Sequence, residues 1–236
     1  MIEHTKLFYL NVKDAIRYSI SDKFAILAMG VFFTFLAVVE EATTSNTILA
    51  IIYLVVLVAL LLFESGYSSK ITEETIHGST EPPRIGHFFE MCRCGVSEAC
   101  VIFTYSLIGV ICSDIMEHYQ YDFYISIGLM LFLTVLWFMM DTSLVYMAYK
   151  KGSIVDGLNI FGILKLYLKL GFSGTFYLLL TSFFTQFVLV SSLATVPSWD
   201  LIGIANFILR FTLAPITMIF SFRLFALQAR IEWANF

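Results

Sequence analysis

Charged residues are scarce in this chain of 236 residues. Lys, Arg, Asp and Glu make up 14% of it, whereas hydrophobic residues make up 59% and aromatic residues 17%. A soluble domain usually carries roughly 25% charged residues, and a globule of this size cannot hide 24 Phe and 12 Tyr in its core. The composition excludes a large water-soluble enzyme, a disordered chain and a disulfide-stapled secreted module. It predicts that lipid is the solvent for much of the chain.

Clustered basic residues are also missing. The net charge is -4, and Lys and Arg are scattered in twos and threes. Attraction to nucleic acid needs a basic stripe or patch, so we expect no nucleic-acid partner. The four cysteines, Cys92, Cys94, Cys100 and Cys112, do not form a secreted framework and are expected to be free thiols.

Recognised catalytic signatures are absent as well. The sequence contains no Walker loop, no Gly-rich dinucleotide turn, no His-Glu-x-x-His and no Gly-x-Ser-x-Gly. We therefore predict no catalytic residues and no cofactor. The acids predicted to lie on the cytoplasmic side are interpreted as parts of solvated amphipathic faces: Asp14, Asp22, Glu73, Glu74, Glu90 and Asp156.

The chain contains six long apolar runs. They are Phe24–Val39, Ile48–Phe63, Ala99–Met116, Phe123–Met140, Phe172–Leu193 and Leu201–Phe222. A helix needs about 20 apolar residues to cross a bilayer, and flanking small residues extend the two shorter runs. No cleavable signal peptide is evident. The sequence predicts an all-α integral membrane protein with six transmembrane helices, in a lipid bilayer, as one domain over residues 1–236.

The basic residues mark one face of the predicted bundle. Every Lys and Arg except Arg210 lies before the first run, after the second, after the fourth or near the C-terminal end. The alternate connections, Glu40–Thr47, Glu117–Asp122 and Ala194–Asp200, contain none. Because basic loops stay in the cytoplasm, we predict a multi-pass cell-membrane protein with both termini cytoplasmic.

The runs recur as pairs at intervals of about 75 residues, a spacing that indicates an internal repeat. An amphipathic segment on the cytoplasmic side precedes each pair, at Phe8–Ile20, Ile85–Val96 and Ile154–Leu168. Such segments are typical of helices that lie in the membrane interface. We predict three hairpins in a threefold repeat, with units near 5–64, 80–149 and 152–227. Similar loop lengths alone would give the same periodicity.

The connection Glu64–Glu98 has a recognisable layout. Ser68–Ile76 is predicted to continue the second span as a charged helix, which Gly78 and Pro82-Pro83 end. The stretch from Gly66-Tyr67 through Pro82-Pro83-Arg84-Ile85 to Phe88-Phe89 resembles an uncharacterised prokaryotic membrane family, a domain of unknown function frequent in methanogenic archaea. The resemblance implies an archaeal source and the six-span layout. It implies no activity, ligand or catalytic residue.

Charges inside the membrane are the best pointers to function, because each is costly unless paired. Arg210 lies ten residues into the last run. Asp114, Glu40 and Gln186 fall in the outer halves of other spans, and Asn206 falls in the outer half of the last span itself. We expect these five side chains to form an intramembrane polar cluster, in which Arg210 pairs with Asp114 or Glu40. The pair is either a structural clamp or an anion site. Pro215 is expected to kink the same span and free the carbonyl of Phe211.

Metal binding is disfavoured. Cys92 and Cys94 have Cys-x-Cys spacing, which is poor for a tetrahedral zinc site, and His87 lies on the opposite helix face from Cys92. Asp114 and His118 share i, i+4 spacing, but a polar capping pair explains them better. No metal ligand is therefore predicted.

Three classes of function fit the sequence. The first is a small-solute transporter or channel with its site in the outer-half polar cluster. The second is a non-catalytic membrane scaffold or assembly partner, whose cytoplasmic amphipathic helices bind lipid or another protein. The third, less favoured, is an intramembrane enzyme that modifies a lipid.

The orientation is tested by labelling single cysteines in a chain whose native cysteines are replaced by serine. A membrane-impermeant maleimide should label Ser198→Cys in intact cells, and Ser153→Cys only after permeabilisation. The opposite pattern would contradict the orientation that the charges predict.

Overall fold

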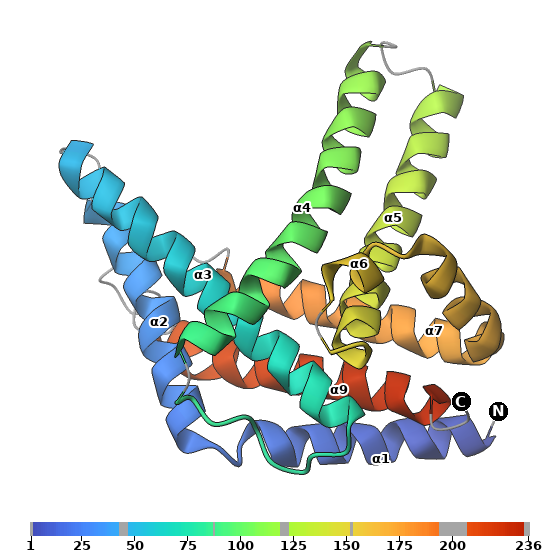
Figure 1. Ribbon diagram of the computed structural model, residues 1–236, viewed down its shortest axis with the longest axis horizontal. Helices are drawn as coiled ribbons and strands as arrows, with labels where there is room; N and C mark the ends of the chain where they lie inside the picture. Colours follow the sequence, from blue (N-terminus) through green and yellow to red (C-terminus); the bar gives the residue numbers. More distant parts are fainter. Residues whose placement is uncertain are drawn as a thin grey trace.

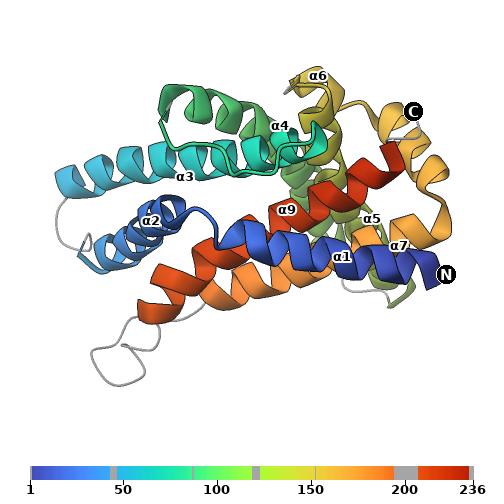
Figure 2. The ribbon, with the colours of Figure 1, turned by 90° about the horizontal axis from the view of Figure 1, so that it is seen from below.

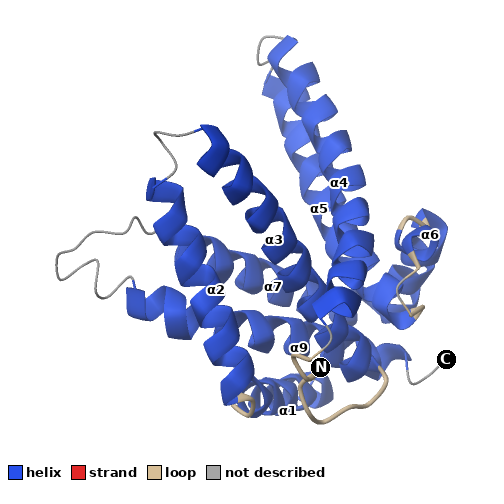
Figure 3. Cartoon of the chain, turned by 60° about the vertical axis from the view of Figure 1, so that its left-hand side comes forward, coloured by secondary structure: helices blue, strands red, loops and turns tan. Residues whose placement is uncertain are grey.

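The computed structural model describes residues 2–42, 47–86, 88–118, 123–151, 153–193 and 207–233. Within these residues it contains helices and loops and no strand (Figure 3). The helices are α1 (Ile2–Ser19), α2 (Lys23–Ala42), α3 (Thr47–Ile76), α4 (Phe88–His118), α5 (Phe123–Tyr149), α6 (Ile154–Gly157), α7 (Ile160–Leu193), the π-helical turn η2 (Leu209–Leu213) and α9 (Ala214–Trp233). The all-α prediction is confirmed.

Among the described residues, four helical stretches are long and apolar enough to cross a membrane: Ile51–Ile76, Phe88–Ile115, Tyr124–Tyr149 and Phe211–Arg230. The number rises to six if each of two bent helix pairs is one span. Large apolar side chains on these helices point outward; Phe103 is 69% exposed and Met130 is 68% exposed. Exposure of this kind is costly in water and favourable in lipid. The chain is therefore built as a multi-pass membrane protein.

The helices form two diverging hairpins on a common base (Figure 1). One hairpin is α2 with α3 and the other is α4 with α5, and the lower part of α3 crosses α4. Seen from below, α1 lies along α9, and α1 begins at the end of the molecule where α9 finishes (Figure 2). The α9 helix also contacts α3 and α7, so it connects the parts of the base.

The three predicted amphipathic segments take three different forms. The first is a separate helix, α1, whose residues Lys6–Ser19 make an angle of 77° with Lys23–Phe35 of α2. The second is not separate, because α4 runs without a break from Phe88 to His118. The third is divided between α6 and the start of α7, which bends by 116° between Ile160–Lys169 and Gly174–Phe184. The threefold arrangement, with an amphipathic helix before each hairpin, is therefore not confirmed.

The structure confirms the expected chain break after Ile76 and shows an irregular turn before Pro215. The α3 helix continues to Ile76, and Gly78 then adopts φ = 100°, a left-handed conformation that glycine permits. The amide N–H of Ser79 donates to the carbonyl of Glu74 and closes the end of the helix. Before Pro215 the last helix widens into the π-turn η2, in which the Phe211 carbonyl approaches Gly30 of α2. A side chain at position 30 would overlap this carbonyl.

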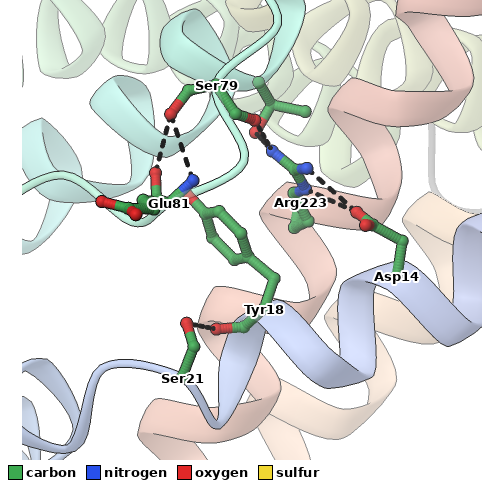
Figure 4. A network of polar contacts seen from close by, with 7 residues as sticks. Asp14, Tyr18, Ser21, Ser79, Glu81 and Arg223 are labelled. Atoms are coloured by element: carbon green, nitrogen blue, oxygen red, sulfur yellow. Dashed lines mark hydrogen bonds and ion pairs between the residues drawn. The ribbon is translucent and has the colours of Figure 1, made fainter.

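A buried arginine holds α1, α3 and α9 together (Figure 4). The Arg223 side chain is 3% exposed, and its Nη2 lies 2.9 Å from Oδ2 of Asp14 on α1. Its Nη1 donates to Oγ1 of Thr75 at 3.0 Å and to the carbonyl of Ser79 at 2.7 Å. The guanidinium also lies 4.2 Å from the ring centroid of Tyr18. Asp14 is exposed to solvent, as the sequence indicated, and it also forms an ion pair with Arg223.

The α3 and α4 helices approach so closely that glycine is needed on both. A Cβ atom at Gly66 of α3 would overlap the carbonyl of Met91, and one at Gly95 of α4 would overlap the carbonyl of Leu62. The two contacts are reciprocal, with the glycine of each helix facing the backbone of the other. Small residues at a crossing let membrane helices approach in this way. The crossing fixes how the side chains just beyond it meet.

Replacing Gly95 with Ala should separate α3 from α4 and destabilise the protein by about 1–3 kcal/mol, the usual cost of overpacking. Gly109→Ala is the matched control, because a Cβ there meets only Leu133 at 3.9 Å. Thermal unfolding in detergent should show a lowered Tm for Gly95→Ala and an unchanged or slightly raised Tm for Gly109→Ala. Equal Tm values would mean that the crossing is not tight.

Candidate functional site

Beyond the glycine crossing, α3, α4, α5, α7 and α9 line a partly open cavity of about 130 Å³. Six of the twelve residues that line it are polar, although most of the lining surface is apolar. The polar residues are Ser69, Thr72, Glu98, Asp141, Ser182 and Ser221, and the apolar ones are Ile102, Met140, Leu144, Val145, Phe222 and Phe225. Most protein cavities this size are apolar and dry, or polar and filled by hydrogen-bonded groups. This one combines two carboxyl groups with two aromatic rings.

Glu98 is the most unusual group in the cavity wall. It lies on α4, one turn beyond Gly95, and it is only 4% exposed. Its Oε2 atom is buried and has no hydrogen-bond partner among the described residues. A buried carboxyl group without a partner costs several kcal/mol. Such a group is expected where a ligand or a proton supplies the missing interaction.

Asp141 is the second carboxyl group, and it comes from α5. Its Oδ2 accepts a hydrogen bond from the hydroxyl of Ser182 on α7. This bond orients the carboxyl group and connects α5 to α7. Asp141 is thus a positioned acid, whereas Glu98 has an oxygen left unbonded.

A third carboxyl group, that of Glu64, lies next to the cavity. It is partly buried on α3, between Leu62 and Gly66 at the glycine crossing. Glu98 is within electrostatic range of both Glu64 and Asp141. The crossing of α3 and α4 is therefore what brings acids from separate helices together.

Basic residues near this region are engaged elsewhere. Lys70 on α3 pairs with Glu73 at 3.1 Å and with Glu90 at 3.3 Å. Arg223 on α9 is held by Asp14, Thr75 and Ser79. Among the side chains that the structure describes, no Lys, Arg or His lines the cavity. The acids of the cavity thus have no basic counterpart among the residues that line it.

The remaining polar groups are hydroxyls. Ser221 of α9 is 1% exposed, and its Oγ, like Oε2 of Glu98, has no partner among the described residues. The Thr72 hydroxyl donates to the carbonyl of Ser68 at 3.0 Å, which leaves its lone pairs available. The arrangement can bind a small polar molecule that donates hydrogen bonds.

The structure brings together a different set of residues from the five predicted by sequence. Asp114 lies on α4 with an exposed side chain. Arg210 belongs to η2, Glu40 to α2 and Gln186 to α7, but their side chains lie outside the described part of the structure, as does all of Asn206. Pairing of Arg210 with Asp114 or Glu40 remains a prediction.

Sequence reasoning missed the three acids, although a signal was present. Each lies directly against an apolar run: Glu64 follows Phe63, Glu98 precedes Ala99, and Asp141 follows Met140. All three are at the ends that the charge pattern assigns to the cytoplasm. Three acids at equal depth on consecutive spans are candidates for one site. Their positions at the ends of the runs made them look like ordinary boundary residues.

The described residues contain no group of three or more His, Cys, Asp or Glu that could hold a metal ion. What they define is an all-helical, multi-pass membrane protein with an internal acidic cavity. Comparisons with protein-family models, curated proteins and solved structures find no match to this chain.

Replacing Glu98 with Met should leave the thermal stability of the purified protein unchanged or raise it, by up to about 3 kcal/mol, because an unpartnered buried carboxyl group is removed. Glu90→Met is the matched control on the exposed face of α4, where the side chain is 54% exposed. Unfolding in detergent, followed by intrinsic fluorescence, gives the comparison. A marked loss of stability in Glu98→Met alone would show that Glu98 serves as a structural group.

Proposed function

We propose that the protein is a small-solute transporter whose solute site is the acidic cavity between α3, α4, α5, α7 and α9. The observation that carries this proposal is the pair of buried atoms without partners, Oε2 of Glu98 and Oγ of Ser221, in the wall of a cavity of about 130 Å³. Ionisable groups inside a membrane bundle generally mark ion or substrate paths. A bound solute would satisfy both atoms.

The proposal changes the location of the site expected from sequence. The outer-half cluster around Arg210 remains a separate hypothesis, and the cavity lies toward the ends of the spans that carry the basic residues. A site at this depth would be reached from the cytoplasm in one state of the carrier and from outside in another. The bends in α7 and between α1 and α2 are breaks at which helices could move.

The six-span arrangement is part of the same proposal. Counting each bent pair as one span gives six, an even number that leaves both termini on the cytoplasmic side. Three hairpins would then surround the cavity, with α3, α4, α5 and α9 as the unbroken spans. In this proposal only the three hairpins are repeated, because the amphipathic segments that precede them differ in form.

The rival functions fit the cavity less well. A scaffold gains nothing from an unpartnered buried carboxyl group, which weakens the fold. An enzyme that cleaves a lipid would need donors or a cation to stabilise the negative charge that develops in the reaction. Apart from the hydroxyl groups, the lining offers acids and apolar side chains.

Transport is tested with three planar solutes of four non-hydrogen atoms each: guanidinium, urea and nitrate. Proteoliposomes loaded with each labelled solute should release at least one of them faster than protein-free vesicles. Ser221→Leu, which fills the cavity, should abolish that release. Ser113→Leu should not, because Ser113 is exposed on α4 away from the cavity.

Release that persists in Ser221→Leu would place the path elsewhere. If the wild-type protein released none of the three solutes, the proposed transport function would be wrong.

A further inference from the structure

The charge around the cavity restricts what the site accepts. Glu98 and Asp141 line it, Glu64 lies nearby, and no basic side chain is part of the lining. When these groups are ionised they repel an anionic solute, and a neutral solute leaves them without a counter-charge. A cation relieves the electrostatic cost and fills the empty hydrogen-bonding position on Glu98.

The volume of the cavity favours a small organic cation over a larger metabolite. A protein cavity of about 150 Å³ accommodates benzene, with six non-hydrogen atoms. At about 130 Å³ this cavity has room for a molecule of about four or five such atoms. Bare metal ions are not favoured by the described residues, since no three ligating side chains converge.

The aromatic wall favours the same class of ligand. Phe222 and Phe225 of α9 lie in the lining, together with Met140 of α5. An aromatic face attracts an organic cation through its quadrupole, and a thioether packs well against apolar groups. A lining that contains both carboxyl groups and aromatic rings suits a compact cation with both N–H donors and a weakly hydrated face.

We infer that the cavity binds a small organic cation of the guanidinium or alkylammonium class, with its N–H groups on Glu98 and Asp141 and its face against Phe222 and Phe225. This inference rests on the proposed transport function for its biological meaning, but binding itself can be measured independently. Glu98 is the principal contact because its Oε2 has no other partner. Asp141, already bonded to Ser182, is the second contact.

The test measures binding of labelled guanidinium, urea and nitrate to the purified full-length protein by equilibrium dialysis. Guanidinium should bind, and urea and nitrate should bind at least about tenfold more weakly, the effect of one charge-assisted contact. Glu98→Gln should weaken guanidinium binding about tenfold or more. Asp141→Asn gives a second measurement if Glu98→Gln fails to fold, and Glu90→Gln on the same helix should bind normally.

The outcomes separate this inference from the proposed function. Equal binding of urea and guanidinium, or unchanged guanidinium binding in both Glu98→Gln and Asp141→Asn, would overturn the cation site. Cavity-dependent release of urea or nitrate would then still support a transporter. Selective guanidinium binding without release of any solute would uphold the cation site and overturn the transport function.

Discussion

Where α3 and α4 cross, their backbones touch without side chains between them. Gly66 faces the carbonyl of Met91, and Gly95 faces the carbonyl of Leu62. This contact controls the acidic site, because Glu64 lies within the α3 part of the crossing and Glu98 is one helical turn beyond its α4 part. With larger residues at either position the helices would separate and the carboxyl groups would no longer meet. The absence of side chains at Gly66 and Gly95 therefore determines which carboxyl groups meet at the cavity.

The protein treats its buried charges in two contrasting ways. Arg223 is fully satisfied, with an ion pair to Asp14, hydrogen bonds to Thr75 and Ser79, and the ring of Tyr18 beside it. A charge satisfied in this way fixes the arrangement of helices. Glu98, at a comparable depth of burial, has an oxygen with no described partner. The same fold thus contains a structural charge and a group that needs a ligand, which is expected when stability is given up at a functional site.

Much of the helical layout could be predicted from the sequence, because apolar runs and chain breaks are local signals. The continuation of α3 through Ser68–Ile76, the turn at Gly78 and the disturbance before Pro215 follow from the residues at those positions. The unbroken α4 could not be predicted from periodicity. Its amphipathic start and apolar continuation have different patterns, and neither excludes a single helix. The site could not be predicted from the sequence, because it depends on which apolar runs pack together. The glycine crossing of α3 and α4 determines that packing. The sequence placed Arg223 among the basic residues near the C-terminal end, because the packing of α9 against α1 and α3 cannot be read from local patterns.

The central claim is that a small organic cation sits on Glu98, and the distance between the two can be measured directly. Solid-state NMR of the protein in lipid, with nitrogen-15 guanidinium and carbon-13 glutamate, reports transfer between the ligand nitrogen and a carboxyl carbon. The account predicts transfer to one glutamate carboxyl group, lost in Glu98→Gln and retained in Glu90→Gln. Absence of transfer in the wild-type protein, or transfer that persists in Glu98→Gln, would contradict it.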